Sequence, residues 1–503
     1  MNRTTASTTI AAIAAGIAIP MVFLPVGGTG AAGSAIAEVT HASALEIEDA
    51  AELYATHCAQ CHGEDLNGGN GGSLIDDVWN HGRESSYIYR NTKFGIAQFG
   101  MPAYDEVLSD REIISIVRFI QASAGEAALP PTPLPEIIQT RDYDLGVEDW
   151  IPEIEGLEIP WGIEFIDDTT ALVAERPGRL RVVENGRMLP DPVRGTPEVL
   201  HAGQGGLMDA APDPDYENNG WVYLAFSHAL DPSDRRGTGA MTKIVRGKLR
   251  KTGSTYEWTD EQTLFEADHD DYLSTRLHYG SRIVFDPDGY LYFAIGDRGR
   301  RPLAQELDKP NGKVYRLHPD GRVPSDNPFN GRRDAYDQIY SYGHRNPQGL
   351  SIHPDTGRLW ITEHGPMGGD EVNLIEPGVN YGWPVISYGI NYNGTIITDK
   401  IRQDGMRQPK LYWNPSIAPC GMEFHDGSSF PRWDNNLFVS GLRPEEVRRL
   451  VIEDENVVHQ EVVIKGLGRV RDVGFDRSGN MYVVTNNPSR VLKITNAGRA
   501  LRQ

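Results

Sequence analysis

The chain has 503 residues, a formal net charge of −22 at pH 7, 54 glycines and 33 prolines. This length is too great for one ordinary hydrophobic core, so we expect two or more domains. The acidic balance argues against a nucleic-acid partner and against binding to an anionic membrane surface, because both are themselves negatively charged.

The first 37 residues have the pattern of a secretory signal peptide. Arg3 precedes an apolar run over residues 10–26, and the small residues Ala35 and Ala37 follow it. A membrane anchor is the alternative, but the run contains two prolines and a glycine and falls short of a comfortable membrane span. We therefore expect cleavage after Ala37, a periplasmic location, and a mature chain without a membrane span.

The segment Cys58-Ala-Gln-Cys61-His62 has the C-x-x-C-H spacing that attaches a c-type haem. In this interpretation both cysteines form thioethers with the haem, and His62 is an axial iron ligand. Zinc is an alternative, but it needs two further ligands at matched spacing, and the chain has no second C-x-x-C. A redox dithiol is another, but it does not require the histidine. The third cysteine, Cys420, stands alone, and we expect a buried thiol in a strand.

The second axial ligand is expected downstream, and Met101 is the main candidate, with His81 as a weaker competitor. Met101 lies between glycine and proline, just before Ser109 and Glu112, which have the spacing of a helix capping box. Apolar residues at helical spacing follow over residues 113–120. A loop methionine before a C-terminal helix resembles the arrangement in small cytochromes c. Methionine ligation raises the haem potential, which suits an acceptor of electrons.

A proline-rich segment separates this part from the rest of the chain. The run Leu129-Pro-Pro-Thr-Pro-Leu-Pro135 predicts a stiff, extended linker. We therefore expect a cytochrome c domain over residues 42–123 and a linker over residues 124–150.

From residue 159 onward a strand–turn–strand pattern recurs six times. Turns such as Asp286-Pro-Asp-Gly289 are typical of tight hairpins. Hairpins repeated at a roughly constant period pack radially as blades. We therefore predict an all-β six-bladed β-propeller over residues 151–500, preceded by the small all-α cytochrome c domain; a pair of β-sandwiches is the alternative. The copies lie at residues 162–173, 207–225, 281–295, 349–362, 421–440 and 473–484.

Polar clusters fall in the loops at the entrances to these blades, where a propeller binds ligands. Arg345 and Asn346 offer a guanidinium and an amide, and arginine suits planar, anionic oxygens. Glycines around Gly365 and Pro366 free backbone carbonyls, and Glu371 adds a carboxylate, which together are the oxygen ligands that calcium prefers.

Three further loops carry candidate side chains. His278 immediately precedes a strand, Gln204 lies among glycines, and Arg469 and Arg471 lie on the same side of one strand. A surface histidine and a solvated arginine pair are the ordinary alternatives. The chain has no G-x-S-x-G elbow and no phosphate-binding loop. Its one dinucleotide-like match, at residues 28–33, lies in the signal segment without a strand–helix context.

Residues 161–496 resemble the soluble PQQ-dependent aldose sugar dehydrogenases, the glucose/sorbosone dehydrogenase family. That family is a six-bladed propeller, in agreement with the repeat count. The segments that carry the resemblance are 203–207, 278–282, 295–297, 345–349, 363–366, 369–373 and 380–384.

The resemblance implies that pyrroloquinoline quinone (PQQ) binds over the channel mouth. His278 matches the general base of the family, and Gln204, Arg345 and Asn346 match residues that contact the cofactor. Arg345 is also implied to stabilise the negative charge that develops on the quinone oxygen. The pair formed by Arg469 and Arg471 matches residues that meet the cofactor's carboxylates.

The resemblance also implies two calcium sites. The backbone carbonyls of Gly365 and Pro366 match ligands of the calcium beside PQQ, and Glu371 and Tyr381 match a second site. The best-studied branch of the family has a lysine near the cofactor where His425 falls in this sequence. Whether His425 contacts PQQ is open at this stage.

The function implied is oxidation of an aldose at its anomeric carbon to a lactone. Hydride passes to PQQ, and electrons then pass singly through the haem to a downstream periplasmic acceptor. A calcium-dependent, lactonase-like hydrolase is one alternative, but hydrolysis needs no electron carrier. A non-catalytic, haem-linked binding propeller is another, but the full set of loop residues argues against it.

Overall fold

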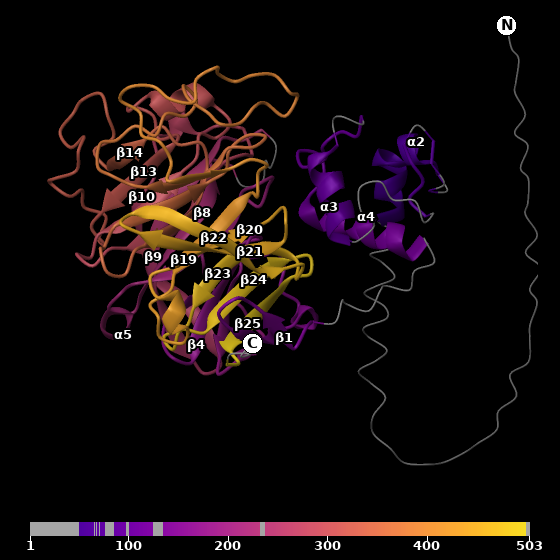
Figure 1. Cartoon of the computed structure of the whole chain (residues 1–503), viewed down its shortest axis with the longest axis horizontal. Helices are drawn as coiled ribbons and strands as arrows, with labels where there is room; N and C mark the ends of the chain where they lie inside the picture. Colours follow the sequence, from indigo (N-terminus) through magenta and orange to yellow (C-terminus); the bar gives the residue numbers. More distant parts are fainter. Residues whose placement is uncertain are drawn as a thin grey trace, which may run out of the picture.

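The computed structural model describes residues 50–64, 66, 68–69, 71–75, 85–96, 100–123, 134–231 and 237–498. It has a small helical domain, formed by the described residues up to 123, and a large β domain (Figure 1). The signal segment, His81 and the start of the expected linker lie outside the described residues. No helix in the described part of the chain is long and apolar enough to cross a membrane.

The helical domain is built on α2 (Ala59–His62), α3 (Ser85–Phe94) and α4 (Asp110–Ser123). The predicted capping box is confirmed at the start of α4. The Ser109 backbone N–H donates to the Glu112 carboxylate at 2.7 Å, and the Glu112 N–H donates to the Ser109 hydroxyl at 3.3 Å. Fully buried residues of α4 face a small core; these are Ile113, Ile116, Val117 and Ile120, packed with Tyr54, Leu66, Ile88, Tyr89 and Leu108.

The predicted six-bladed propeller is confirmed, because the β domain contains six separate antiparallel sheets. Each predicted hairpin supplies the first two strands of one sheet. The first three sheets are β3 (Pro160–Phe165), β4 (Thr170–Glu175), β5 (Leu180–Glu184) and β6 (Arg187–Met188); β7 (Leu207–Pro212), β8 (Trp221–Ala229), β9 (Ala240–Thr252) and β10 (Thr255–Phe265); and β11 (Ser281–Phe285), β12 (Leu291–Ile295), β13 (Lys313–Leu317) and β14 (Ile339–Tyr342).

The other three sheets complete the ring. They are β15 (Pro347–Ile352), β16 (Leu359–Glu363), β17 (Asp370–Leu374) and β18 (Leu411–Trp413); β19 (Pro419–Phe424), β20 (Leu437–Gly441), β21 (Glu446–Glu453) and β22 (Asn456–Lys465); and β23 (Arg469–Phe475), β24 (Met481–Asn486) and β25 (Arg490–Asn496), joined by β2 (Asp144–Ile151) and β1 (Ile137–Gln139). Short helical turns lie between strands: α5 (Tyr216–Asn219), η2 (Glu153–Glu155), η3 (His269–Asp271), η4 (Arg301–Gln305) and η5 (Pro431–Trp433).

The sixth sheet closes the ring with strands from both ends of the β domain. β2 pairs antiparallel with β25, from Leu145 opposite Asn496 to Ile151 opposite Val491. The expectation that the linker extends to residue 150 is therefore wrong at its C-terminal end. These strands complete a sheet whose other strands lie more than 300 residues later in the sequence. No local sequence pattern predicts that pairing.

The first strand of each sheet is innermost and packs against the first strand of the next, and β23 returns to β3. Because neighbouring strands are antiparallel, each innermost strand begins at the end of the ring where the second strand of its blade finishes. We call this end the propeller mouth. Arg282 lies deep between the innermost strands, with its guanidinium 3.3 Å from Asp209 and 3.0 Å from Asp472. The centre is thus filled by a buried ion-pair network.

Candidate functional site

The best-defined polar constellation at the propeller mouth is built around His278, which precedes β11. Its Nδ1 lies 2.6 Å from Oδ1 of Asp297, and its backbone N–H donates to the side-chain oxygen of Gln204 at 2.8 Å. Asp297 lies two residues beyond the end of β12, and its second oxygen accepts a hydrogen bond from the indole of Trp383 at 2.7 Å. His278 also has a φ of 51°, an uncommon conformation that such contacts can hold at a functional site.

The surroundings favour a neutral His278 near pH 7. Burial and the positive charge of Arg345 lower the pKa of the imidazole, and Asp297 opposes them only in part. With Nδ1–H donated to Asp297, the other ring nitrogen carries the lone pair. The arrangement is therefore that of an oriented general base.

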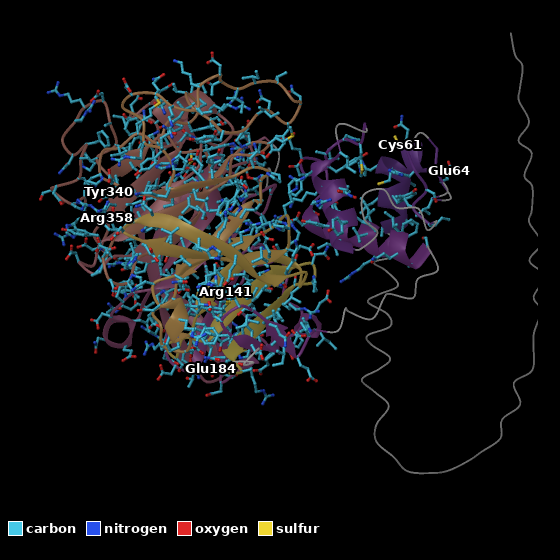
Figure 2. All side chains as sticks on the ribbon, viewed as in Figure 1. Cys61, Glu64, Arg141, Glu184, Tyr340 and Arg358 are labelled. Carbon is cyan, nitrogen blue, oxygen red and sulfur yellow. The ribbon has the colours of Figure 1, made fainter. Side chains whose placement is uncertain are left out.

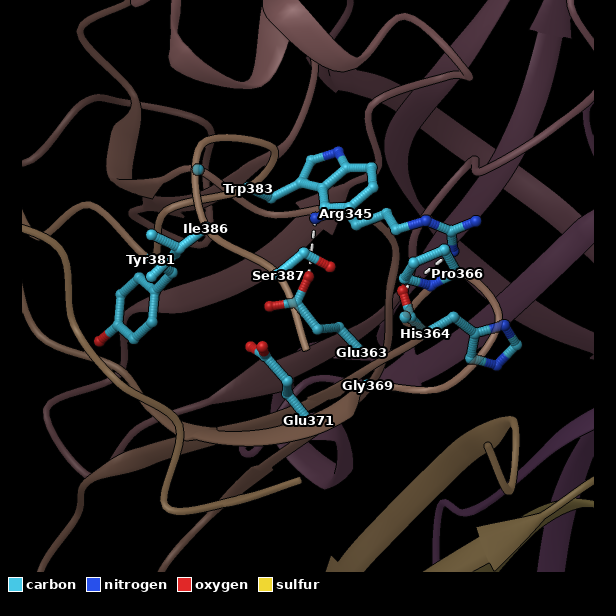
Figure 3. A pocket seen from close by; sticks show the side chains of 12 residues that line it. Arg345, Glu363, His364, Pro366, Gly369, Glu371, Tyr381, Trp383, Ile386 and Ser387 are labelled. Carbon is cyan, nitrogen blue, oxygen red and sulfur yellow. Dashed lines mark hydrogen bonds between the residues drawn. The ribbon is translucent and has the colours of Figure 1, made fainter. Parts of the chain in front are cut away.

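Arg345 is held rigidly at the start of β15. Its backbone N–H donates to Glu363 at 2.7 Å, and its Nη1 donates to the carbonyl of His364 at 3.0 Å (Figure 3). The guanidinium carbon also lies 5.5 Å from the ring centre of Trp383. The group is nearly buried, yet none of these partners for its guanidinium is a carboxylate, so it can still receive negative charge.

The side-chain oxygen of Asn346 is occupied by hydrogen bonds within the propeller. It accepts hydrogen bonds from the backbone N–H of Gly280 at 3.2 Å and from Gln348 at 3.3 Å. The oxygen therefore fastens the start of β11 to the start of β15. The Gln204 oxygen is committed in the same way, because it holds the backbone of His278.

Arg469 and Arg471 are both buried on β23. Arg471 lies over Trp161, with its guanidinium carbon 3.9 Å from the ring centre, and donates to Asn486 at 3.3 Å and to the Cys420 sulfur at 3.1 Å. The Nε of Arg469 has no hydrogen-bond partner among the described residues. The expectation that Cys420 is a buried thiol in a strand is confirmed.

A small pocket at the mouth brings together the predicted calcium ligands. It is lined by Gly365, Pro366 and Glu371, and the carboxylates of Glu363 and Glu371 face one another across it (Figure 3). Enclosure and repulsion from Glu363 raise the pKa of Glu371 to about 8. The described residues contain no group of three or more His, Cys, Asp or Glu side chains arranged to hold a metal ion.

The structure also places Tyr381 and His425. Tyr381 lines the pocket, but its hydroxyl points away from it and donates to the carbonyl of Leu374 at 2.6 Å (Figure 3). His425 is fully buried beyond β19, where its Nε2 lies 3.0 Å from the carbonyl of Gly479. His425 lies five positions along the chain from Cys420 at the mouth, a span of roughly 16 Å for extended strand, so His425 does not reach the site.

In the helical domain, α2 carries the haem motif, with Cys61 labelled in Figure 2. Neither cysteine of the motif is in a disulfide. The Nδ1 of His62 lies 2.8 Å from the carbonyl of Gly72, which fixes the ring and leaves Nε2 for an iron, as metal-binding histidines usually do. Met101 follows α3, with its backbone paired to Ile96.

Four site residues were given no individual role in the sequence analysis. Asp297 and Trp383 fix the His278 ring, Glu363 holds the backbone of Arg345, and His364 has a buried Nε2 without a hydrogen-bond partner. Glu363 is the last residue of β16, and the other three lie in loops at the mouth. All four also lie in segments that carry the family resemblance, at residues 295–297, 363–366 and 380–384.

The fold and site define a six-bladed β-propeller with an oriented histidine at its mouth, joined to a small helical domain that carries a C-x-x-C-H motif. Comparison with known proteins identifies the family to which this chain belongs. Residues 157–493 match the family model for glucose/sorbosone dehydrogenase, and residues 45–120 match that for cbb3-type cytochrome c oxidase subunit III. The chain belongs to the glucose/sorbosone dehydrogenase family, with an N-terminal cytochrome c domain. It is therefore an oxidoreductase of the sugar dehydrogenase type.

Three relatives illustrate the likeness. The aldose sugar dehydrogenase YliI of Escherichia coli (strain K12) is 36% identical over 390 residues, which cover 76% of this chain and 99% of the relative. A crystal structure of a glucose dehydrogenase has a TM-score of 0.65 at 38% identity and covers 70% of this chain and 99% of its own. The PQQ-bound aldose sugar dehydrogenase of Streptomyces coelicolor has a TM-score of 0.55 at 27% identity, with 70% and 98% covered.

Proposed function

We propose that the protein is an exported, PQQ-dependent aldose dehydrogenase that passes electrons to a covalently bound haem c. The observation that carries the proposal is the general base formed by His278 and Asp297, set beside buried arginines that have no anionic partner on the propeller. A base that removes a proton and cations that receive negative charge are what hydride transfer from a sugar to a quinone requires.

The residues at the mouth fit a planar, anionic cofactor. Arg471 and Arg469 are buried cations on one strand, and the Nε of Arg469 and the Nε2 of His364 lack hydrogen-bond partners among the described residues. Buried donors without partners are rare in folded proteins, so a carboxylate oxygen of PQQ would satisfy the Nε–H of Arg469. Gln204 and Asn346 would contact PQQ only through their amide nitrogens, because protein groups already occupy their oxygens.

Bound PQQ would accept the hydride from the anomeric carbon of the aldose. The Nε2 of His278 takes the proton of the anomeric hydroxyl, and Asp297 stabilises the imidazolium that forms. Arg345, held by the His364 carbonyl, faces the negative charge that develops. The sugar thus loses one hydride and one proton and leaves as a lactone.

Calcium would offset the repulsion between the carboxylates of Glu363 and Glu371 in the pocket beside Arg345. The raised pKa of Glu371, about 8, reflects enclosure and the facing Glu363, and a divalent cation would favour the ionised forms of both. The carbonyls of Gly365 and Pro366 are further oxygen ligands. Tyr381 would contribute its backbone carbonyl and not its hydroxyl.

In the helical domain, Cys58 and Cys61 would hold the haem, with His62 and Met101 as axial ligands. The haem takes one electron at a time, so two transfers follow each sugar oxidised. A downstream periplasmic acceptor would then reoxidise the haem, and the signal-like residues 1–37 support export of the chain.

Reconstitution tests this proposal directly. The purified protein is loaded with PQQ and calcium, an aldose is added, and the absorption of reduced haem is followed. We expect reduction with at least one common aldose and none when PQQ is left out. A protein that binds no quinone, or whose haem stays oxidised with every aldose, would contradict the proposal.

A further inference from the structure

Helices α3 and α4 of the helical domain lie beside the propeller (Figure 1), and a side chain of each contacts it. Asp110, the first residue of α4, forms an ion pair with Arg176 of the propeller and another with Lys93 of α3. The Tyr89 hydroxyl donates to the same carboxylate at 2.7 Å. Asp110 therefore joins groups from both domains.

A second contact lies beside the first. The guanidinium carbon of Arg469 lies 5.4 Å from the ring centre of Tyr89 and 5.6 Å from that of Phe94. Aromatic faces at such distances attract a cation. We call Tyr89, Lys93, Phe94 and Asp110 the docking face.

The ion pair between the domains is shielded from water. Asp110 and Arg176 are each only 3% exposed. Burial lowers the pKa of Lys93 to about 7 despite Asp110, whereas an arginine stays charged at any ordinary pH. Although burial disfavours its ionised form, Arg176 and Lys93 hold the pKa of Asp110 well below its usual range. Arg176 is thus the permanent partner of this carboxylate.

The docking face lies against the propeller mouth and near the expected iron ligand. Arg176 follows β4 at the mouth, and its carbonyl accepts from the backbone of Leu207, three residues after Gln204. Arg469 is two residues from Arg471 on β23. On the other side, α3 ends at Phe94, and the Ile96 backbone beyond it pairs with that of Met101.

We propose that the docking face seats the helical domain on the propeller mouth, with Asp110 anchored on Arg176, and that this docked arrangement is the one in which electrons pass to the haem. The inference rests on the proposed function. The reduced cofactor would give two electrons, one at a time, to ferric haem. Because one haem holds only one of these electrons, the external acceptor must remove the first before the second can pass. The alternative is a helical domain that swings on its linker and collects electrons in passing encounters.

The test uses the full chain loaded with PQQ and calcium, and two readouts for each variant. One is the rate of haem reduction by an aldose, and the other is turnover with a soluble dye that takes electrons directly from the reduced cofactor. We expect Asp110→Asn to slow haem reduction roughly tenfold or more, because it leaves Arg176 buried without its counter-charge, and to leave dye turnover unchanged. Glu106→Gln is the matched control, since Glu106 is an exposed carboxylate of the same domain.

A second variant and a structural measurement test whether the effect of Asp110 comes from its contact with Arg176. Arg176→Gln should slow haem reduction like Asp110→Asn, and the double variant should be no slower than either single one, because both remove one interaction. Small-angle X-ray scattering of the cofactor-free chain should give a larger radius of gyration for both variants than for the native protein.

Two results would overturn the docking proposal. One is unchanged haem reduction and an unchanged radius of gyration in both variants. The other is an equal loss in the dye and haem assays, which would place Asp110 in the support of the cofactor site. Absence of dye turnover in the native protein would instead contradict the proposed function, and the scattering comparison would still test docking.

Discussion

The centre of the propeller and its mouth both bury arginines, but they balance the charge differently. At the centre, Arg282 lies between Asp209 and Asp472. At the mouth, Arg471 has an amide, a thiol and an indole face as partners, and Arg469 faces the Tyr89 ring without an ion pair to any described carboxylate.

The difference matters because a buried carboxyl and a buried arginine respond to burial in different ways. A buried carboxyl can take up a proton: burial and Asp209 raise the pKa of Asp472 to about 6 even beside Arg282. An arginine cannot lose its proton in the same way. An unmatched buried arginine therefore needs an anion from elsewhere, which at this mouth is Asp110 of the helical domain for Arg176 and, by our proposal, the cofactor for the pair on β23.

The largest effect is expected from replacing His278, which should lower turnover without preventing cofactor binding. Replacing it by Gln should lower turnover of the loaded enzyme by about 10²–10⁴-fold, because the base is lost, while PQQ still binds. Turnover and quinone affinity are measured on the same preparation. Undiminished turnover would remove His278 as the base.

Breaking the balanced centre should instead cost stability. Arg282→Met leaves Asp209 and Asp472 buried without their cation, which should lower the free energy of unfolding by about 3–5 kcal/mol. Denaturant unfolding of the cofactor-free chain measures the loss. Arg332→Ala, at an exposed pair with Asp334, is the control and should change little. An equal loss in both variants would contradict the special role of the centre.

An unbalanced arginine at the mouth should behave in the opposite way. Arg469→Gln should weaken quinone binding by about tenfold to a hundredfold and leave the stability of the cofactor-free chain unchanged or raised. Arg449→Gln is the matched control, because this buried arginine is paired with Glu461 at 2.7 Å and should lose stability without losing quinone affinity. The two arginines would be equivalent if both variants lost stability alike.

The smallest effect concerns pH. Because burial and Arg345 lower the pKa of His278 below 6.5, the base stays neutral to lower pH, and kcat/KM should fall only below pH 6.5. Asp297→Asn removes a group that raises this pKa, so the acid limb should move to still lower pH while the plateau falls. Profiles of kcat/KM from about pH 4 to 8 measure both. An acid limb above pH 6.5 would argue against this environment for the base.

Features encoded in short segments were open to prediction from the sequence. The six hairpins, the C-x-x-C-H motif on α2 and the capping box of α4 all depend on residues a few positions apart. The period of two along a strand, the turn residues and the helix cap act locally, so a linear pattern carries them. The blade count and the entrances that carry His278 and Arg345 followed from these patterns.

Contacts between distant segments required the folded chain. The pairing of β2 with β25, the hold of Asp297 and Trp383 on His278, and the contact of Asp110 with Arg176 join residues far apart in sequence. The direction of a side chain was equally hidden, as for the Tyr381 hydroxyl and the buried His425. Local chemistry fixes which elements form, whereas packing decides which charged groups are buried beside a counter-charge of their own domain and which must find one in a ligand or in the other domain.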